Sequence, residues 1–85
     1  MKPEKILKAL ANKRRLEMLK YLNKNKEAVV VDIADGINLS VRATSKHLLK
    51  LTDAEILINN QKGIYVFYKL SQPVHPLVRL TISLL

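Results

Sequence analysis

The sequence predicts an α+β fold with four helices, then a two-stranded β-hairpin, then a final helix. Apolar residues recur at spacings of three and four over most of the chain, as they do on the buried face of a helix. Two late runs, 56–60 and 64–70, are instead rich in β-branched and aromatic residues and predict paired strands. No repeat, low-complexity tract or linker divides the chain, so residues 1–85 are expected to form a single domain.

The first two helices are predicted from their caps and apolar spacing. Pro3 suits the first turn of a helix, and Asn12 can cap a second one. The apolar residues at helical spacing are Ile6, Leu7 and Leu10 in the first helix and Leu16, Leu19 and Leu22 in the second. The basic residues expected to face solvent on the second helix are Lys13, Arg14, Arg15, Lys20 and Lys24. The polar run 23–27 predicts a break.

The third and fourth helices are predicted at 32–37 and 40–53, with a break at 36–38 between them. Asn38 tolerates the left-handed backbone that a tight turn requires, and Ser40 is a good N-cap. Two helices joined in this way form a helix-turn-helix, whose second helix enters the DNA major groove. The alternative is an ordinary amphipathic helix with a solvated basic face.

A helical wheel for 40–53 separates a buried side from a basic side. The residues on the buried side are Thr44, Leu48 and Leu51, with His47 beside them. Arg42, Lys46 and Leu49 point the opposite way. The hairpin that follows favours the DNA-binding interpretation, because a helix-turn-helix followed by a hairpin is a winged helix. The segment "NNQKG" would form the wing tip, with 61–63 as its loop, and residues 74–85 would form the last helix.

Charge and composition narrow the possible functions. The net charge is +8, from 15 Lys and Arg against 7 Asp and Glu, which favours a polyanionic partner such as nucleic acid. The chain has no cysteine, so disulfides and thiolate metal sites are excluded, and a reducing, cytoplasmic location is expected. No phosphate-binding loop or catalytic constellation is present, so no enzyme activity and no cofactor are expected. Arg79 interrupts the longest apolar stretch, so no membrane association is expected.

Three segments carry a resemblance to a known family. They are "ALANKRRLEMLKYL", "DIADGINLSVRATSKHLLKLTDAEIL" and "KGIYVFYKL", and together they cover roughly residues 9–70. Their order and spacing resemble the ArsR/SmtB family of bacterial and archaeal winged-helix repressors. The resemblance implies a double-stranded-DNA-binding transcriptional regulator, with repression as the expected sign, that acts as a homodimer paired through its terminal helices.

The chain departs from the family pattern at three positions. Asn38 and Glu55 stand where the family usually has glycine, and the charge of Glu55 is unfavourable at a helix C-terminus, which predicts a weak helix end there. Leu49 stands where a polar residue is common. An exposed leucine could contact a thymine methyl group or pack against a neighbouring residue.

These interpretations assign two sets of residues. The expected DNA-binding residues are Ser40, Val41, Arg42, Ser45, Lys46, Lys50, Lys62 and Gly63. The expected homodimer interface contains Ile6, Leu7, Leu10, Val74, Leu77, Val78, Thr81, Leu84 and Leu85. The runner-up function is a winged-helix module that binds protein or RNA.

No metal site is expected, although many members of the family sense metals. One known family site uses cysteines in the third helix, and another uses Asp, His and Glu on the C-terminal helices; here only His75 remains near the second. Zinc requires three or four ligands. His75 is therefore expected to cap the last helix or lie at the surface, and His47 to pack between helices. Tyr65, Phe67 and Tyr68 are expected to pack the wing rather than stack on bases.

Overall fold

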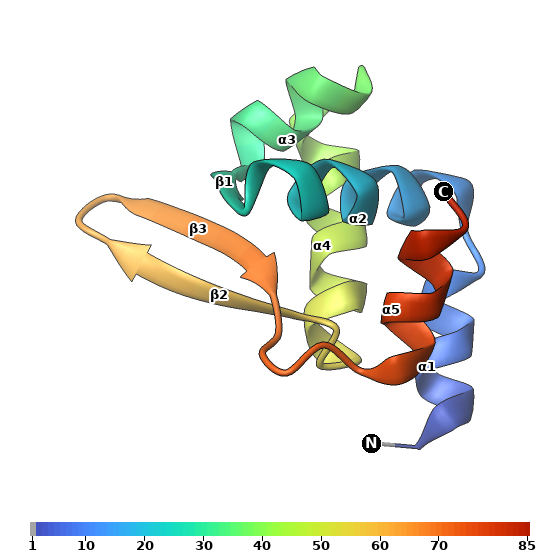
Figure 1. Ribbon diagram of the computed structural model, residues 1–85. Coiled ribbons are helices and arrows are strands. Elements are labelled where there is room, and N and C mark those ends of the chain that lie inside the picture. The colour runs from blue at the N-terminus through green and yellow to red at the C-terminus, as the bar shows by residue number, and fades with distance from the viewer. Residues whose placement is uncertain (1) are drawn as a thin grey trace.

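The computed structural model describes residues 2–85, which form five helices and a three-stranded sheet (Figure 1). The elements in chain order are α1 (Pro3–Leu10), α2 (Lys13–Asn25), β1 (Glu27–Val29), α3 (Val30–Ile37), α4 (Val41–Asp53), β2 (Leu57–Lys62), β3 (Tyr65–Leu70) and α5 (Pro76–Ser83). The predicted winged helix-turn-helix is confirmed, with α3 and α4 as the helix-turn-helix and the β2–β3 hairpin as the wing. No helix within residues 2–85 has the length and hydropathy needed to cross a membrane.

The predicted caps and the turn are confirmed. Oδ1 of Asn12 accepts a hydrogen bond from the backbone N–H of Arg15 at 3.1 Å, which starts α2. Oγ of Ser40 accepts from the N–H of Ala43 at 3.1 Å, which starts α4. Asn38 is left-handed, with φ 56° and ψ 55°, and turns the chain between α3 and α4. Each of these features depends on one side chain and its immediate neighbours.

The predicted two-stranded hairpin is present as β2 and β3, but the sheet also contains a third strand that the sequence did not predict. The sheet has the order β1-β3-β2, and β1 pairs antiparallel with β3 from Glu27↔Lys69 to Val29↔Phe67. A strand of three residues is too short to show alternation, and its partner is distant in sequence. The third strand joins the wing to the segment between α2 and α3.

Several predicted boundaries also need correction. α2 continues to Asn25, because the polar residues that suggested a break lie on its exposed face; Lys26, with φ 72°, ends it. α3 begins at Val30 rather than at residue 32, and α5 covers Pro76–Ser83 rather than 74–85. The expected loop 61–63 is shorter, because Lys62 pairs with Tyr65 and leaves a two-residue turn.

Gly36 does not break the chain, as the sequence suggested, but lies inside α3. A Cβ atom at this position would overlap the ring of Tyr21 on α2. The glycine therefore lets α3 lie directly against α2. This is a packing requirement, which local turn chemistry does not reveal.

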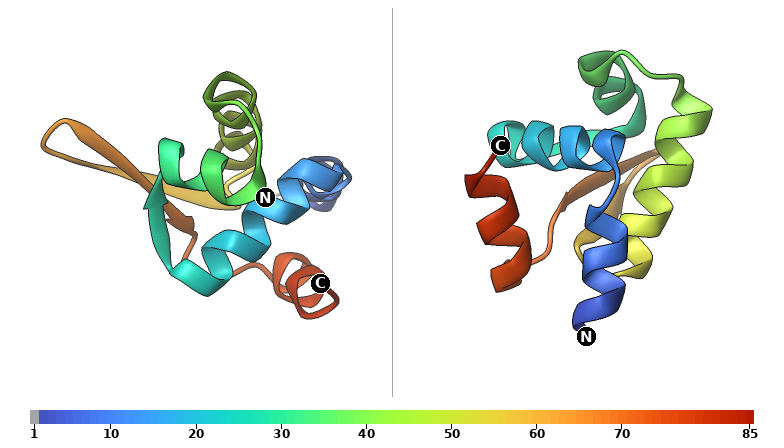
Figure 2. Two further views of the ribbon diagram at one scale, coloured as in Figure 1. Left: turned by 90° about the horizontal axis from the view of Figure 1, so that it is seen from above. Right: turned by 90° about the vertical axis from the view of Figure 1, so that its right-hand side faces the viewer.

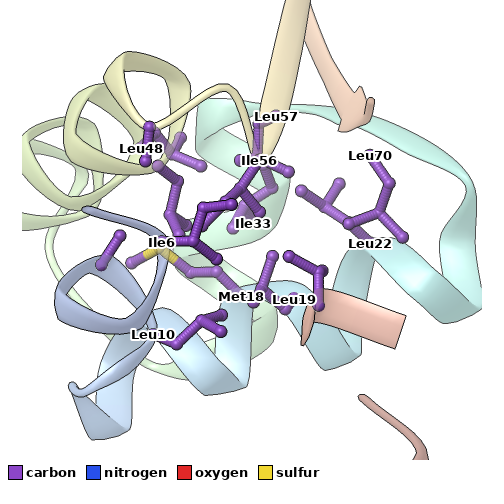
Figure 3. Packing of buried hydrophobic residues seen from close by; sticks show 14 of the residues in the cluster. Ile6, Leu10, Met18, Leu19, Leu22, Ile33, Leu48, Ile56, Leu57 and Leu70 are labelled. Carbon is purple, nitrogen blue, oxygen red and sulfur yellow. The ribbon is translucent and has the colours of Figure 1, made fainter. Parts of the chain in front are cut away.

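The core lies where the helices meet the base of the wing. Figure 3 shows Ile6 and Leu10 of α1, Met18, Leu19 and Leu22 of α2, Ile33 of α3, Leu48 of α4, and Ile56, Leu57 and Leu70 from the hairpin segment packed together. In both views of Figure 2, α4 and α5 lie on opposite sides of the molecule. The outer face of α4 is therefore directed away from α5.

Candidate nucleic-acid interface

The helix α4 has the two sides that the wheel predicted. Thr44, Leu48 and Leu51 are fully buried, and their burial fixes the rotation of the helix. The residues exposed on the helix are Val41, Arg42, Ser45, Lys46, Leu49, Lys50 and Asp53. The hydroxyl of Ser40 is engaged in the N-cap. The outer face has a basic excess and contains two large apolar side chains, Leu49 at 60% and Val41 at 45% exposure.

Arg14 fixes the helix-turn-helix to α2. Its Nη1 donates to the carbonyl oxygen of Ile37 at 2.8 Å and lies 3.2 Å from Oε1 of Glu17. Ile37 is the last residue of α3, so its carbonyl lies next to the left-handed Asn38. The guanidinium thus satisfies a helix-end carbonyl and places the turn relative to α2.

Arg15 connects α1, α2 and α4. Its Nε donates to the carbonyl oxygen of Ala9 at 2.6 Å, and its Nη2 to that of Lys8 at 3.4 Å. Its Nη1 lies 3.2 Å from Nδ1 of His47 on α4. The sequence predicted solvent-facing side chains for Arg14 and Arg15, but both are half-buried and hold backbone carbonyls. Apolar spacing contains no signal for such contacts.

The ring of His47 is neutral in this arrangement. A guanidinium only donates hydrogen bonds, so Nδ1 accepts and the ring proton lies on Nε2. Burial lowers the pKa of His47 below its ordinary value of 6.5, and the charges of Arg15, Arg14 and Lys50 lower it further. The expected packing role of His47 between helices agrees with this placement.

The wing turns at Gly63, which has φ 64° and open space where a Cβ atom would lie. Lys62 does not extend from the tip. Its Nζ lies 3.1 Å from Oε1 of Glu27 on β1 and 5.0 Å from the ring centre of Phe67. Tyr68 packs against the core as expected, whereas Tyr65 is 57% exposed.

The residues expected at the interface on the terminal helices fall into three groups by exposure. Ile6, Leu10 and Val78 are at most 5% exposed and belong to the core of the single chain. Val74, Leu77 and Thr81 are half-buried. The large apolar residues left exposed on or beside α1 and α5 are Leu7, Leu80, Leu84 and Leu85.

Neither histidine lies in a potential metal site. Within residues 2–85, no three His, Cys, Asp or Glu residues come together in a way that could hold a metal ion. Nδ1 of His75 accepts from the backbone N–H of Leu77 at 3.1 Å and caps α5, as expected.

Comparisons with known proteins agree with this geometry. Residues 12–59 match the model of a family described as bacterial regulatory protein, arsR family. The chain is 32% identical over 72 residues to the arsenic resistance transcriptional regulator ArsR1 of Pseudomonas putida, which covers 85% of this chain and 56% of that protein. It is 32% identical over 69 residues to the transcriptional repressor SdpR of Bacillus subtilis, which covers 81% of this chain and 76% of SdpR. The chain thus spans little more than half of ArsR1.

A solved structure supports the fold assignment. The homodimeric winged helix-turn-helix DNA-binding domain of a Mycobacterium bovis protein superimposes with a TM-score of 0.83 at 26% identity. The match covers 95% of this chain and 72% of that domain.

Proposed function

The chain belongs to the ArsR family of bacterial regulatory proteins, and we propose that it is a sequence-specific repressor that binds double-stranded DNA as a homodimer. The family and the fold are those of DNA-binding transcriptional regulators rather than enzymes. The observation that carries the proposal is the exposed basic face of α4, held by the capped turn after α3.

The α4 face and the wing take separate roles in this proposal. Arg42, Ser45 and Lys46 face the major groove and contact base edges and phosphates, and Ser40, Val41 and Lys50 border them. Lys62 and Gly63 approach the backbone from the wing. Contacts to bases give sequence specificity, and contacts to phosphates fix the position of the protein on the duplex.

Homodimerisation and repression are supported by relatives and by the surface of the terminal helices. SdpR is named a transcriptional repressor, and the Mycobacterium bovis domain is homodimeric. Leu7, Leu80 and Leu84 are 52%, 59% and 78% exposed, so α1 and α5 present apolar area that a second copy would cover. A two-fold dimer would place two α4 helices about one DNA turn apart.

We further propose that this regulator works in the cytoplasm without a metal or another cofactor. The chain contains no cysteine. Nδ1 of His47 lies next to the guanidinium of Arg15, and Nδ1 of His75 caps α5, so the two imidazoles have separate structural contacts. Control would then come from protein abundance, a partner or a small molecule.

A winged-helix module for protein binding is the second candidate. One observation favours it, a groove of about 590 Å³ between α3 and the wing whose exposed apolar side chains are Val31, Ile64, Tyr65 and Val66. RNA binding remains the other form of this alternative, with the basic face as its site.

A selection of bound sequences from a random duplex pool tests the main proposal. A palindromic consensus is expected. Arg42→Ala should lower affinity for that consensus by about 1–3 kcal/mol if the side chain makes a bidentate base contact. Lys24→Ala, which removes an exposed charge from α2, is the matched control.

Two results would refute the assignment. If Arg42→Ala and Lys46→Ala both bind the consensus like the parent, α4 is not the recognition helix. If single-stranded RNA binds more tightly than duplex DNA in a gel shift, the alternative function is correct.

A further inference from the structure

A hollow of about 280 Å³ between α1 and the C-terminal half of α4 is strongly basic. We call it the α1–α4 hollow. Its lining residues are Lys5, Lys8, Ala9, Arg15, Lys50, Asp53 and Ala54. Four of these are basic and one is acidic, so the hollow has a formal excess of three positive charges. An excess of this kind attracts an anion to the surface between the two helices.

Arg15 supplies a fixed part of this charge. The partners of its guanidinium are two backbone carbonyls and the neutral imidazole of His47. These contacts hold the group in place but do not neutralise it. No ion pair involving Arg15 or Asp53 occurs among residues 2–85.

The lysines of α1 are free to bind a ligand. Lys5 and Lys8 are exposed and lie three residues apart, on the side of α1 that faces α4, whereas Leu7 lies on another side of the helix. Neither lysine forms a salt bridge within the described part of the chain. Their ammonium groups can therefore move toward an anion without losing an existing partner.

The hollow continues the outer face of α4. Lys46 and Lys50 are one helical turn apart on α4, and Lys50 also lines the hollow. Figure 2 (right) shows α1 running beside α4, on the side of α4 away from the wing in the left view. The positive surface thus extends from Lys46 through Lys50 to Lys5 and Lys8.

We propose that Lys5 and Lys8 of α1, together with Lys50, bind a phosphate group of the DNA backbone beside the groove that α4 enters. This inference rests on the proposed function and adds α1 to the DNA-binding surface. The hollow is open and its lysines are exposed, which suits a phosphate presented by a duplex rather than an enclosed small anion. Arg15 is a positioning residue that holds the end of α1 against α4.

The salt dependence of binding to random-sequence duplex DNA tests the proposal. Each phosphate contact contributes about 0.9 to the slope of log K against log salt concentration. The variant Lys5→Ala/Lys8→Ala should lower the slope by up to about 0.9 per protomer, the contribution of one phosphate, and weaken all sequences alike. Lys5→Arg/Lys8→Arg, which keeps both charges, should retain the slope of the parent.

The matched control is Lys20→Ala/Lys24→Ala, which removes the same two charges from exposed positions of α2. The C-terminal half of α2 lies on the opposite side of the molecule from α4 in Figure 2 (left). A fall in slope for the α1 variant alone supports the proposal. If both variants lower the slope equally, net charge alone explains the result and the proposal is overturned. If neither variant changes the slope, Lys5 and Lys8 do not contact a phosphate and the proposal is likewise overturned.

Two further results separate this proposal from others. If the parent binds no duplex at all, the proposed function itself fails. Inorganic phosphate, titrated into the free protein at constant ionic strength and followed by NMR, identifies a small-anion site. Saturable binding of phosphate that is lost in Lys5→Ala/Lys8→Ala would assign the hollow to a small anion instead of DNA.

Discussion

Nη1 of Arg15 lies 3.2 Å from Nδ1 of His47, and this contact joins the first turn of α2 to α4. It requires an unprotonated Nδ1, because both groups would otherwise be donors. The same guanidinium holds the carbonyl of Ala9 at the end of α1. The protonation state of one imidazole is thus coupled to the packing of three helices.

The first prediction concerns the pH dependence of stability. The pKa of folded His47 is lowered, so between that pKa and 6.5 the unfolded chain binds the proton more strongly. The contribution of His47 to stability is therefore complete above about pH 6.5 and is lost as the pH falls through the folded pKa. His47→Gln should remove this part of the dependence, because its amide oxygen accepts from Arg15 without taking up a proton.

Urea unfolding of the parent and of His47→Gln between pH 5 and 8 measures the effect. The two proteins differ only at position 47, so the difference between the two curves isolates His47. The difference should grow in favour of the variant as the pH falls below about 6.5. Parallel curves over this range would show that His47 does not couple protonation to folding.

The second prediction concerns the end of α4. Glu55 has φ 60°, which costs a non-glycine residue about 1–2 kcal/mol, while its N–H still donates to the carbonyl of Thr52 at 2.9 Å. The helix end is therefore closed by hydrogen bonds but strained. Glu55→Gly should raise the free energy of unfolding by about 0.5–1 kcal/mol, after the greater flexibility of glycine in the unfolded chain is subtracted.

Glu55→Gln is the control for this position. It removes the charge at the helix C-terminus but keeps the left-handed backbone. Chemical denaturation of both variants separates the two causes. If Glu55→Gln is stabilised as much as Glu55→Gly, electrostatics rather than backbone strain explains the gain.

The sequence predicted the features that depend on neighbouring residues. Asn12 and Ser40 cap their helices, and Asn38 makes the left-handed turn, because each needs only its own backbone and the next few residues. The burial of Leu48 followed from helical spacing. These local features were enough to identify the helix-turn-helix and the wing.

Features that depend on distant contacts were missed. Glu27 begins a strand only because β3 offers an edge, and Arg15 turns inward because carbonyls of α1 and the ring of His47 surround it. Ile6 and Val78 share the apolar spacing of the exposed leucines, yet they are buried within one chain. Spacing identifies an apolar face but not what covers it.

The third prediction concerns the pair between Lys62 and Glu27. The carboxylate holds Nζ of Lys62 on the sheet, so a backbone phosphate must compete with it. Glu27→Gln should free the ammonium group and strengthen binding to all duplex sequences, with a salt slope steeper by up to about one. Gel shifts at several salt concentrations measure both quantities.

The double variant Glu27→Gln/Lys62→Ala is the control for that prediction. Removing an acid raises net charge and strengthens DNA binding in a general way. The gain specific to Lys62 should disappear in the double variant. If the double variant binds as tightly as Glu27→Gln, the wing lysine does not contact DNA.

The fourth prediction concerns the homodimer. Leu80→Glu places a charge on the exposed face of α5, twice in a symmetric dimer. The dimer would lose two buried leucines, one from each protomer, at about 2 kcal/mol each, and its affinity would fall roughly a thousandfold. Sedimentation at micromolar concentration should show a dimer for the parent and a monomer for the variant. Ile64→Glu, at an 87% exposed position on the wing, is the matched control and should remain dimeric.

The last prediction is that zinc, nickel and cobalt do not release the protein from DNA. Nδ1 of His47 accepts from Arg15 and Nδ1 of His75 caps α5, so each imidazole has a structural role and offers only Nε2 to a metal. Zinc needs three or four ligands, and a ligand shifts an equilibrium only through different affinities for the two states. Titration of each metal into the protein–DNA complex, with chelator as control, measures release. Dissociation at one metal per dimer, at micromolar free metal or below, would show that this chain senses metal after all.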